Sequence, residues 1–189
     1  PGPAPPAGPG PFFNPQDKSM KAAERIIQAI VVLARIGAGL AFLLLIIAVL
    51  VQVVGRTTGN SPVWSEELTR FALLYLVAFG AGLSLRTGDM VNVDVISENL
   101  PGKLPWILRL VSAAATAGLA LYLLPHAWRF TAIGQMQSSP ALGLKMSYVH
   151  FTVFLFLALL ALFAVLRVIA MLTGAEDGKP EKALDAPEI

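Results

Sequence analysis

Four long apolar runs with few charged residues dominate the sequence of this 189-residue chain. They cover about residues 36–54, 62–85, 106–129 and 148–167. A helix needs about 20 apolar residues to cross the roughly 30 Å hydrocarbon core of a bilayer, so each run is long enough for one crossing. The sequence therefore predicts an all-α integral membrane protein with four transmembrane helices.

The composition argues against most kinds of catalytic and metal site. The chain has no cysteine, which excludes disulfides, thiolate metal sites and cysteine nucleophiles, and only 2 histidines. The net charge of +2 is too small to suggest binding to nucleic acid. No Ser/His/Asp arrangement, phosphate loop or metal-ligand spacing is visible, so we predict neither an enzyme nor a cofactor.

The segments outside the apolar runs have distinct compositions. Residues 1–17 are rich in proline, glycine and alanine and predict a disordered leader, and the charged residues 174–189 predict a disordered tail. Between them lies a membrane domain of residues 18–173. Its first part, from Lys18 to Arg35, has basic residues on one helical face, which predicts an interfacial amphipathic helix or the solvated first turns of the first span. The link 86–105 fits a short interfacial helix, although its alternating valines also fit a strand.

The distribution of positive charge predicts the orientation in the membrane. Four spans place both ends of the chain on one side, together with the link 86–105. More lysine and arginine residues lie on that side than on the other, so the positive-inside rule places both termini in the cytoplasm. The cytoplasmic group is Lys18, Lys21, Arg25, Arg86, Lys103, Arg109, Arg167, Lys179 and Lys182, and the opposite group is Arg56, Arg70, Arg129 and Lys145.

The second span opens with signals for the start of a membrane helix. Ser61 is a good N-cap and Pro62 suits the first helical turn. Trp64 stands where an aromatic residue of the interfacial belt is expected. The second span is therefore expected to start at about residue 62.

A charged cluster follows at once, at the outer face of the predicted topology. Glu66 and Glu67 lie near the helix N-terminus, where negative charge is favoured, and Glu66 shares a face with Arg70 and can pair with it. The two glutamates point about 100° apart, so they cannot both face one substrate. The small residues Gly80 and Gly82 further along allow another helix to approach closely. Ionisable groups in a membrane helix indicate a functional or assembly site.

The span centres favour an accessory subunit over a carrier. They show no broken helix, internal repeat or central charge, features that transport sites usually have. Two alternatives stay open. His126 and His150 are expected at similar depth on neighbouring spans and could ligate haem in a membrane cytochrome. The chain could also be an independent channel or small carrier.

Several motifs of the chain resemble a known family. The block Trp64–Arg70 resembles the W-x-E-E-L-x-R signature of the small membrane subunit, of DctQ type, of tripartite ATP-independent periplasmic (TRAP) transporters. The resemblance covers about residues 18–173, and the order and spacing of its blocks agree with four helices. The further matching blocks are Phe79–Ala81, Arg86–Gly88, Val91–Asp94, Leu100–Pro101 and Ser139–Leu142. The chain departs from the family at Met90, where histidine is usual, and at Lys145, where proline is common.

The resemblance implies partners and a role. It implies a large membrane subunit that carries the substrate and sodium sites, and a periplasmic binding protein that delivers a carboxylate substrate. The small subunit would brace the large one in the bacterial inner membrane during elevator-type movement and help to dock the binding protein.

The family motif and the chemistry of the individual residues together indicate which residues lie at the interface. Glu66, Glu67 and Arg70 are expected to form a network with each other or with the large subunit. Trp64 is expected to set the depth of the second span, and Asp94 to cap or pair at the cytoplasmic link. The alternative for the acidic pair is a solvated helix N-terminus, and for Asp94 an ordinary turn residue.

Overall fold

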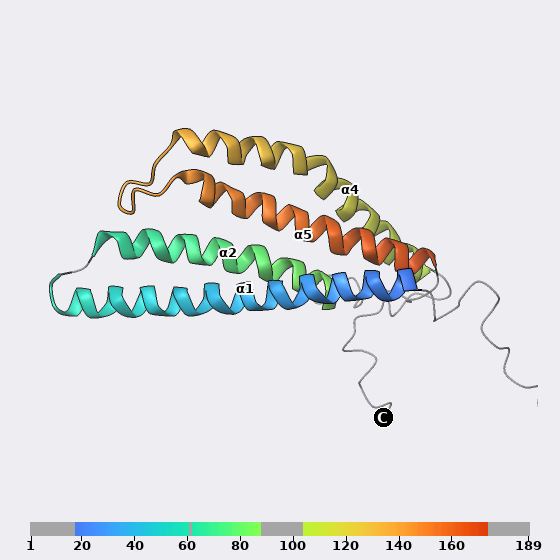
Figure 1. Cartoon of the computed structure of the whole chain (residues 1–189), viewed down its shortest axis with the longest axis horizontal. Coiled ribbons are helices and arrows are strands. Elements are labelled where there is room, and N and C mark those ends of the chain that lie inside the picture. The colour runs from blue at the N-terminus through green and yellow to red at the C-terminus, as the bar shows by residue number, and fades with distance from the viewer. Residues whose placement is uncertain (1–17, 61, 88–103, 174–189) are drawn as a thin grey trace, which may run out of the picture. The chain divides into compact units, whose positions relative to one another are not determined.

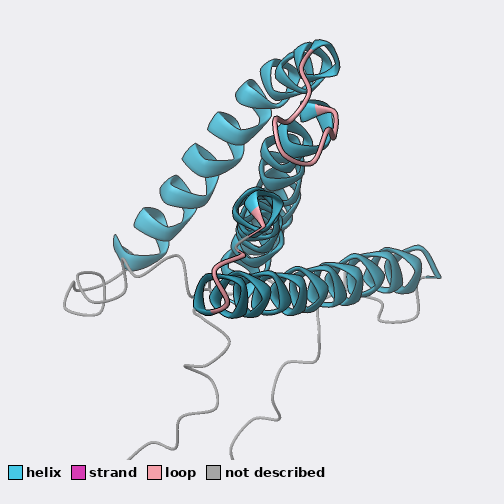
Figure 2. Ribbon diagram, turned by 90° about the vertical axis from the view of Figure 1, so that its left-hand side faces the viewer, coloured by secondary structure: helices cyan, strands magenta, loops and turns pink. Residues whose placement is uncertain are grey.

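The computed structural model describes residues 18–60, 62–87 and 104–173, and almost all of them are helical. The elements are α1 (Lys18–Thr57), α2 (Val63–Thr87), α4 (Leu104–Ile133), the short 3₁₀ helix η1 (Gly134–Met136) and α5 (Met146–Leu172). Figure 2 shows these helices, and the described ranges contain no strand. The predicted all-α class is confirmed.

The four predicted spans correspond to four long helices. Within the described residues, four helices are long and apolar enough to cross a membrane, and they cover Arg25–Thr57, Val63–Leu85, Leu104–Met136 and Met146–Leu172. Helices α4 and α5 extend a few residues beyond the predicted runs at both ends, α2 extends beyond its run only at the C-terminal end, and α1 begins well before its run, at Lys18. The predicted leader, tail and interfacial helix of the link, including Asp94 and Met90, lie outside the described residues.

Helix α1 is longer than one crossing requires. Its 40 residues form one continuous helix, which at 1.5 Å per residue is about 60 Å long. It therefore joins the predicted amphipathic segment and the first span without a break. The chain divides into two compact units, residues 1–33 and 34–189, and the first unit contributes only the N-terminal part of α1 to the described residues.

Within the unit of residues 34–189, α5 is the central helix. It packs against α4 on one side and α2 on the other, as Figure 1 shows. The core between α4 and α5 combines small residues of α4, Ala120 and Ala127, with Leu157 and Ala161 of α5. Small side chains let the two helix backbones approach, which is how membrane helices gain packing energy when lipid is as apolar as the core.

Helix α2 approaches α5 most closely at Gly82. A Cβ atom on Gly82 would lie 2.8 Å from the Cβ of Leu159, so only glycine fits without a shift of one helix. Two further contacts join the helices. The Tyr75 hydroxyl donates a hydrogen bond of 2.8 Å to the carbonyl of Tyr148, and Arg167 Nη1 donates one of 3.5 Å to the carbonyl of Leu85.

Helix α1 carries a stripe of buried small residues. Ala34, Ala41, Ala48 and Gly55 recur every seven residues and are buried, the spacing of helices that cross at a small angle. Gly37 lies on the same stripe, where an added Cβ would lie 2.7 Å from the Phe79 ring of α2.

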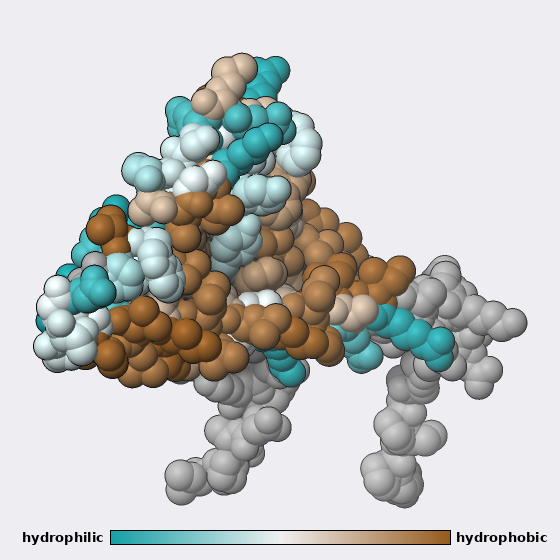
Figure 3. Space-filling model, turned by 60° about the vertical axis from the view of Figure 1, so that its left-hand side comes forward, coloured by the Kyte–Doolittle hydropathy of each residue, from teal (hydrophilic) through white to brown (hydrophobic). Residues whose placement is uncertain are grey.

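The rest of the helical surface is apolar and exposed. Only between 11% and 33% of each candidate span is buried inside the structure. Figure 3 shows hydrophobic residues over the bodies of the helices, with hydrophilic residues gathered towards their ends. Such a surface suits lipid or protein partners and not water.

Candidate functional site

The charged cluster lies at one end of the unit of residues 34–189, which we call the loop end. The loop end carries the α1–α2 turn at residues 58–60 and the α4–α5 loop at residues 137–145, and Figure 1 shows both there. Gly59, with a φ of +74°, ends α1. The amide of Asn60 donates a hydrogen bond of 2.9 Å to the carbonyl of Gly55. A glycine in this conformation is a common helix stop, because a residue with a Cβ is strained there.

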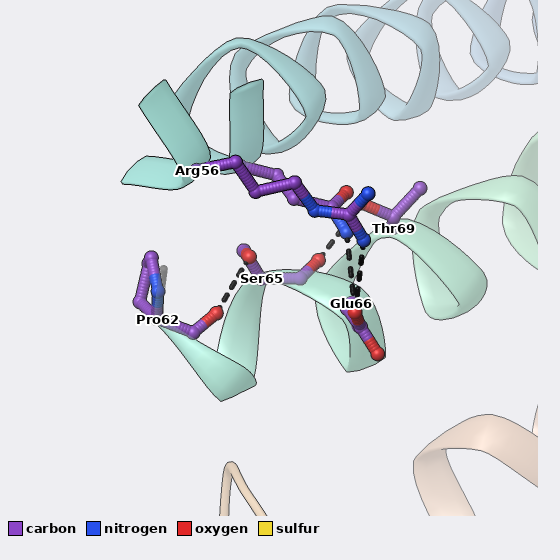
Figure 4. A network of polar contacts seen from close by, with 6 residues as sticks. Arg56, Pro62, Ser65, Glu66 and Thr69 are labelled. Carbon is purple, nitrogen blue, oxygen red and sulfur yellow. Dashed lines mark hydrogen bonds and ion pairs between the residues drawn. The ribbon is translucent and has the colours of Figure 1, made fainter. Parts of the chain in front are cut away.

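The first turn of α2 is held by serine and threonine hydroxyls. The Ser65 hydroxyl donates a hydrogen bond of 2.7 Å to the carbonyl of Pro62, and Thr69 donates one of 2.8 Å to the carbonyl of Ser65. Ser65 is completely buried, and Figure 4 shows these hydroxyls beside the charged pair. Helix α2 begins at Val63, one residue later than expected, so that Pro62 directly precedes the first helical turn. The predicted N-cap Ser61 lies outside the described residues.

Glu66 ties α2 to α1. Arg56 Nη2 donates a hydrogen bond of 3.3 Å to Glu66 Oε1, and Gln52 Nε2 donates one of 3.4 Å to the same oxygen. Figure 4 shows Arg56 reaching from the last turn of α1 to Glu66. The side chains of Arg56 and Glu66 are 65% and 50% exposed, so this ion pair contributes less than about 1 kcal/mol in water.

Glu67 ties the same turn of α2 to the α4–α5 loop. Its Oε2 atom accepts a hydrogen bond of 2.6 Å from the Ser139 hydroxyl. It also accepts backbone N–H bonds of 3.2 Å from Ala141 and 2.9 Å from Leu142. Ser139 is only 3% exposed, so this contact, unlike that of Glu66, has one partner shielded from water.

The α4–α5 loop is a tight hairpin that presents these donors. The Ser139 amide donates a hydrogen bond of 2.8 Å to the Leu144 carbonyl, and the Met146 amide donates one of 2.9 Å to the Gln137 carbonyl. Gly143 has a φ of +66°, which lets the chain reverse. With its ends fixed in this way, the loop holds the amides of Ala141 and Leu142 side by side above Glu67.

The two adjacent glutamates therefore hold different elements. Neighbouring residues on a helix point about 100° apart, and here Glu66 points to α1 and Glu67 to the loop before α5. In the described part of the chain, Glu66 pairs with Arg56 and not with Arg70, which shares its helical face. Arg70 is exposed and has no ion pair in the described part of the chain.

The other expected interface residues fall into two groups. Trp64 is 41% exposed at the start of α2, which suits a residue of the membrane interface. Gly82 contacts α5 inside the subunit, whereas a Cβ on Gly80 would meet nothing within 4 Å. Of the two small residues predicted to meet another helix, only Gly82 meets a helix of this chain.

The two histidines form separate, ordinary contacts. The ring Nδ1 atom of His126 lies 3.2 Å from the Tyr122 carbonyl, and that of His150 lies 3.1 Å from the Phe130 carbonyl. His150 also stacks on the Phe130 ring at a centroid distance of 3.9 Å. Among the described residues, no group of three or more His, Cys, Asp or Glu could hold a metal ion.

Sequence reasoning missed three residues of the loop end: Arg56, Gln52 and Ser139. Arg56 and Gln52 lie on the last two turns of α1, on the face that the small-residue stripe marks, and that stripe was a readable signal. Ser139 lies in a recognised block of the family, but nothing in the local sequence connects it with Glu67. Arg109, near the start of α4, is only 5% exposed.

Comparison with known proteins places the chain in a family. The model of the DctQ component of tripartite ATP-independent periplasmic transporters matches residues 45–174. This range contains the charged cluster, the α4–α5 loop and three complete long helices. No curated protein matches the chain. The matched range is well over half of the chain, and the protein therefore belongs to the DctQ family, the small membrane subunits of TRAP transporters.

Proposed function

We propose that this subunit is the fixed scaffold of its transporter. It would brace a large membrane subunit that takes up a carboxylate by sodium-coupled transport, with a periplasmic binding protein delivering the substrate. The family membership supports the subunit role, and the sodium coupling, the substrate class and the identity of the partners are proposals.

The observation that carries this proposal is the double attachment of α2. Glu66 joins its first turns to α1, and Glu67 joins the same turns to the α4–α5 loop. An elevator-type transporter needs one part that stays still while another moves through the membrane. In this subunit, polar contacts join α2 to α1 and to the α4–α5 loop at one end, and Gly82 packs α2 against α5. Such a rigid arrangement suits the part of a transporter that stays still.

The apolar span centres support the same role. Between Phe71 and Leu85 of α2 there is no ionisable side chain except that of Tyr75, which hydrogen bonds to α5. Transport sites for ions usually need polar side chains or broken helices near the middle of the membrane. The substrate and ion sites are therefore proposed to lie on the large subunit.

We further propose that the loop end faces the periplasm and that both termini are cytoplasmic, in the inner membrane. The positive-inside rule supports this orientation, because more lysine and arginine residues lie at the opposite end of the spans. In this orientation the α4–α5 loop, with exposed Met136 and Lys145 near its ends, is available to the binding protein.

Purification from the native locus tests the proposal. The tagged chain would be isolated in mild detergent and the co-purifying proteins identified by mass spectrometry. A polytopic membrane protein of more than ten predicted spans is expected, and deletion of this chain should abolish uptake. Isolation of the chain alone, with substrate flux through it in liposomes or a Soret absorbance band, would contradict the scaffold role and favour a carrier or a cytochrome.

A further inference from the structure

One face of α2 has no neighbour among the residues that the structure describes. Leu73 and Leu74 lie three and four residues after Arg70, and Val77 lies three residues after Leu74, so these residues share one side of the helix. All four are exposed, and the exposed fractions of Leu73, Leu74 and Val77 are 49%, 43% and 52%. Gly80 continues the line, and a Cβ there would meet nothing within 4 Å. We call these five residues the open face of α2.

The other faces of α2 are occupied. Phe79 meets Gly37 of α1, and Gly82 meets Leu159 of α5. Tyr75 and Glu67 are bonded to residues around the start of α5. The described helices of the 34–189 unit that contact α2 therefore do so on its other faces, and the open face stays exposed.

Arg70 makes this face unusual for a surface against lipid. It lies six residues beyond Trp64, which is about 9 Å further along the helix axis. If Trp64 stands at the membrane interface, the Arg70 backbone lies within the hydrocarbon layer, where a charged group is costly unless it is paired.

The nearby carboxylates are already engaged. Arg56 and Gln52 bind Glu66 Oε1, and Ser139, Ala141 and Leu142 bind Glu67 Oε2. Arg70 acts on Glu67 through its charge, but in the described part of the chain it forms no ion pair or hydrogen bond with either glutamate. The guanidinium group is thus available to an acceptor from outside the subunit.

We propose that the open face of α2 packs against a transmembrane helix of the large membrane subunit, and that Arg70 pairs there with a carboxylate on that helix. This inference rests on the proposed function and adds the surface and the chemistry of the contact. A carboxylate matches the planar guanidinium with two parallel hydrogen bonds. Gly80 gives the partner backbone room to approach, and Leu73, Leu74 and Val77 supply the apolar contact.

The exposed surface of α1 is a contrasting case. Its exposed large side chains between Ile36 and Val51 are aliphatic or aromatic, and no charged residue lies in that range. Nothing there requires a polar partner, so lipid satisfies that surface. The charge at Arg70 is the feature that distinguishes the open face of α2.

Matched variants of the complex test the proposal. Arg70→Glu is compared with Arg129→Glu, an exposed arginine at the same end of α4. Gly80→Leu is compared with Gly39→Leu, since Gly39 of α1 also has nothing within 4 Å of an added Cβ. For each variant, the amount of large subunit that co-purifies is measured, together with the melting temperature of the isolated small subunit.

We expect Arg70→Glu and Gly80→Leu to reduce co-purification at least tenfold, a loss of about 1.4 kcal/mol or more in association, with unchanged melting temperatures. Arg129→Glu and Gly39→Leu should retain normal yield. A carboxylate of the large subunit that is cross-linked to position 70, and whose replacement by arginine restores binding to Arg70→Glu, would identify the partner residue.

The proposal and the proposed function fail in different ways. If the wild-type chain co-purifies no large subunit, the subunit role itself fails. If the wild type binds and both open-face variants bind equally well, the surface assignment is overturned and the scaffold role stands. If Gly39→Leu reduced co-purification of the large subunit as much as Gly80→Leu, the proposal that α2 and not α1 forms the contact would be overturned. Normal complex yield together with loss of bound anionic lipid from Arg70→Gln, seen by native mass spectrometry, would show that Arg70 binds a lipid phosphate instead.

Discussion

The Ser139 hydroxyl donates a hydrogen bond of 2.6 Å to Glu67 Oε2, although the two residues are 72 positions apart in the chain. With the amides of Ala141 and Leu142, this contact joins the start of α2 to the loop that precedes α5. It closes the loop end on the side opposite to the Arg56–Glu66 pair.

The contact between Glu67 and Ser139 predicts coupled effects of substitution. Ser139→Ala removes the shortest of the hydrogen bonds to Glu67, and Glu67→Gln weakens all of them by removing the negative charge. Each variant should lower the melting temperature of the purified subunit by a few degrees and reduce complex yield or uptake. Because both residues belong to one network, the double variant should lose less than the sum of the two single losses. Fully additive losses in thermal unfolding would contradict the contact.

The extent of each helix was predictable because hydrophobic runs determine it directly. A segment as apolar as residues 148–167 is most stable in the bilayer, and there a helix satisfies the hydrogen bonds of its backbone N–H and C=O groups. The start of α2 was predictable to within one residue, because proline is common at the beginning of a helix and α2 begins at Val63, directly after Pro62.

The partners of the charged residues were not predictable in the same way. A helical spacing of four suggested Arg70 for Glu66, but Arg56 lies across the α1–α2 turn and is closer. Ser139 could not be connected with Glu67 from the sequence, because the packing of α2 on α5 brings the loop to that carboxylate. Gly80 and Gly82 looked equivalent as small residues, and only the rotation of α2 against α5 separates them.

That rotation predicts different effects of alanine at the two glycines of α2. Gly82→Ala places a Cβ 2.8 Å from the Leu159 Cβ, which forces the helices apart and should cost about 1–3 kcal/mol of stability. Gly80→Ala places its Cβ in open space and should leave the isolated subunit as stable as the wild type, or more so, because alanine favours helix. Unfolding of both variants in denaturing detergent measures the difference, and equal stabilities would contradict the described packing of α2 on α5.

The end of α4 offers a second matched pair of glycines. A Cβ on Gly134 would lie 2.6 Å from His150 Nδ1 and 2.6 Å from the backbone nitrogen of Ser147, whereas one on Gly118 would meet nothing within 4 Å. Backbone cannot give way as a flexible side chain can, so Gly134→Ala should destabilise the junction of α4 and α5 by about 1–3 kcal/mol. Gly118→Ala should be close to neutral.

Limited proteolysis of the α4–α5 loop tests this second pair. Faster cleavage near residues 137–145 is expected for Gly134→Ala and wild-type rates for Gly118→Ala. Wild-type cleavage of both would show that the junction has more room than the structure gives it.

The two adjacent glutamates should respond differently to the same substitution. Glu66 and Arg56 are 50% and 65% exposed, so water and salt screen their pair, and Glu66→Gln should cost less than about 1 kcal/mol. The loss should shrink further between 0.05 M and 0.5 M salt, because the screening length falls from above about 10 Å to a few ångströms. Glu67→Gln should have the larger effect and depend less on salt, because its Ser139 partner is only 3% exposed. Melting temperatures of both variants across that salt range make the comparison, and a larger or more salt-resistant effect at Glu66 would mean that the α1–α2 attachment is the stronger of the two.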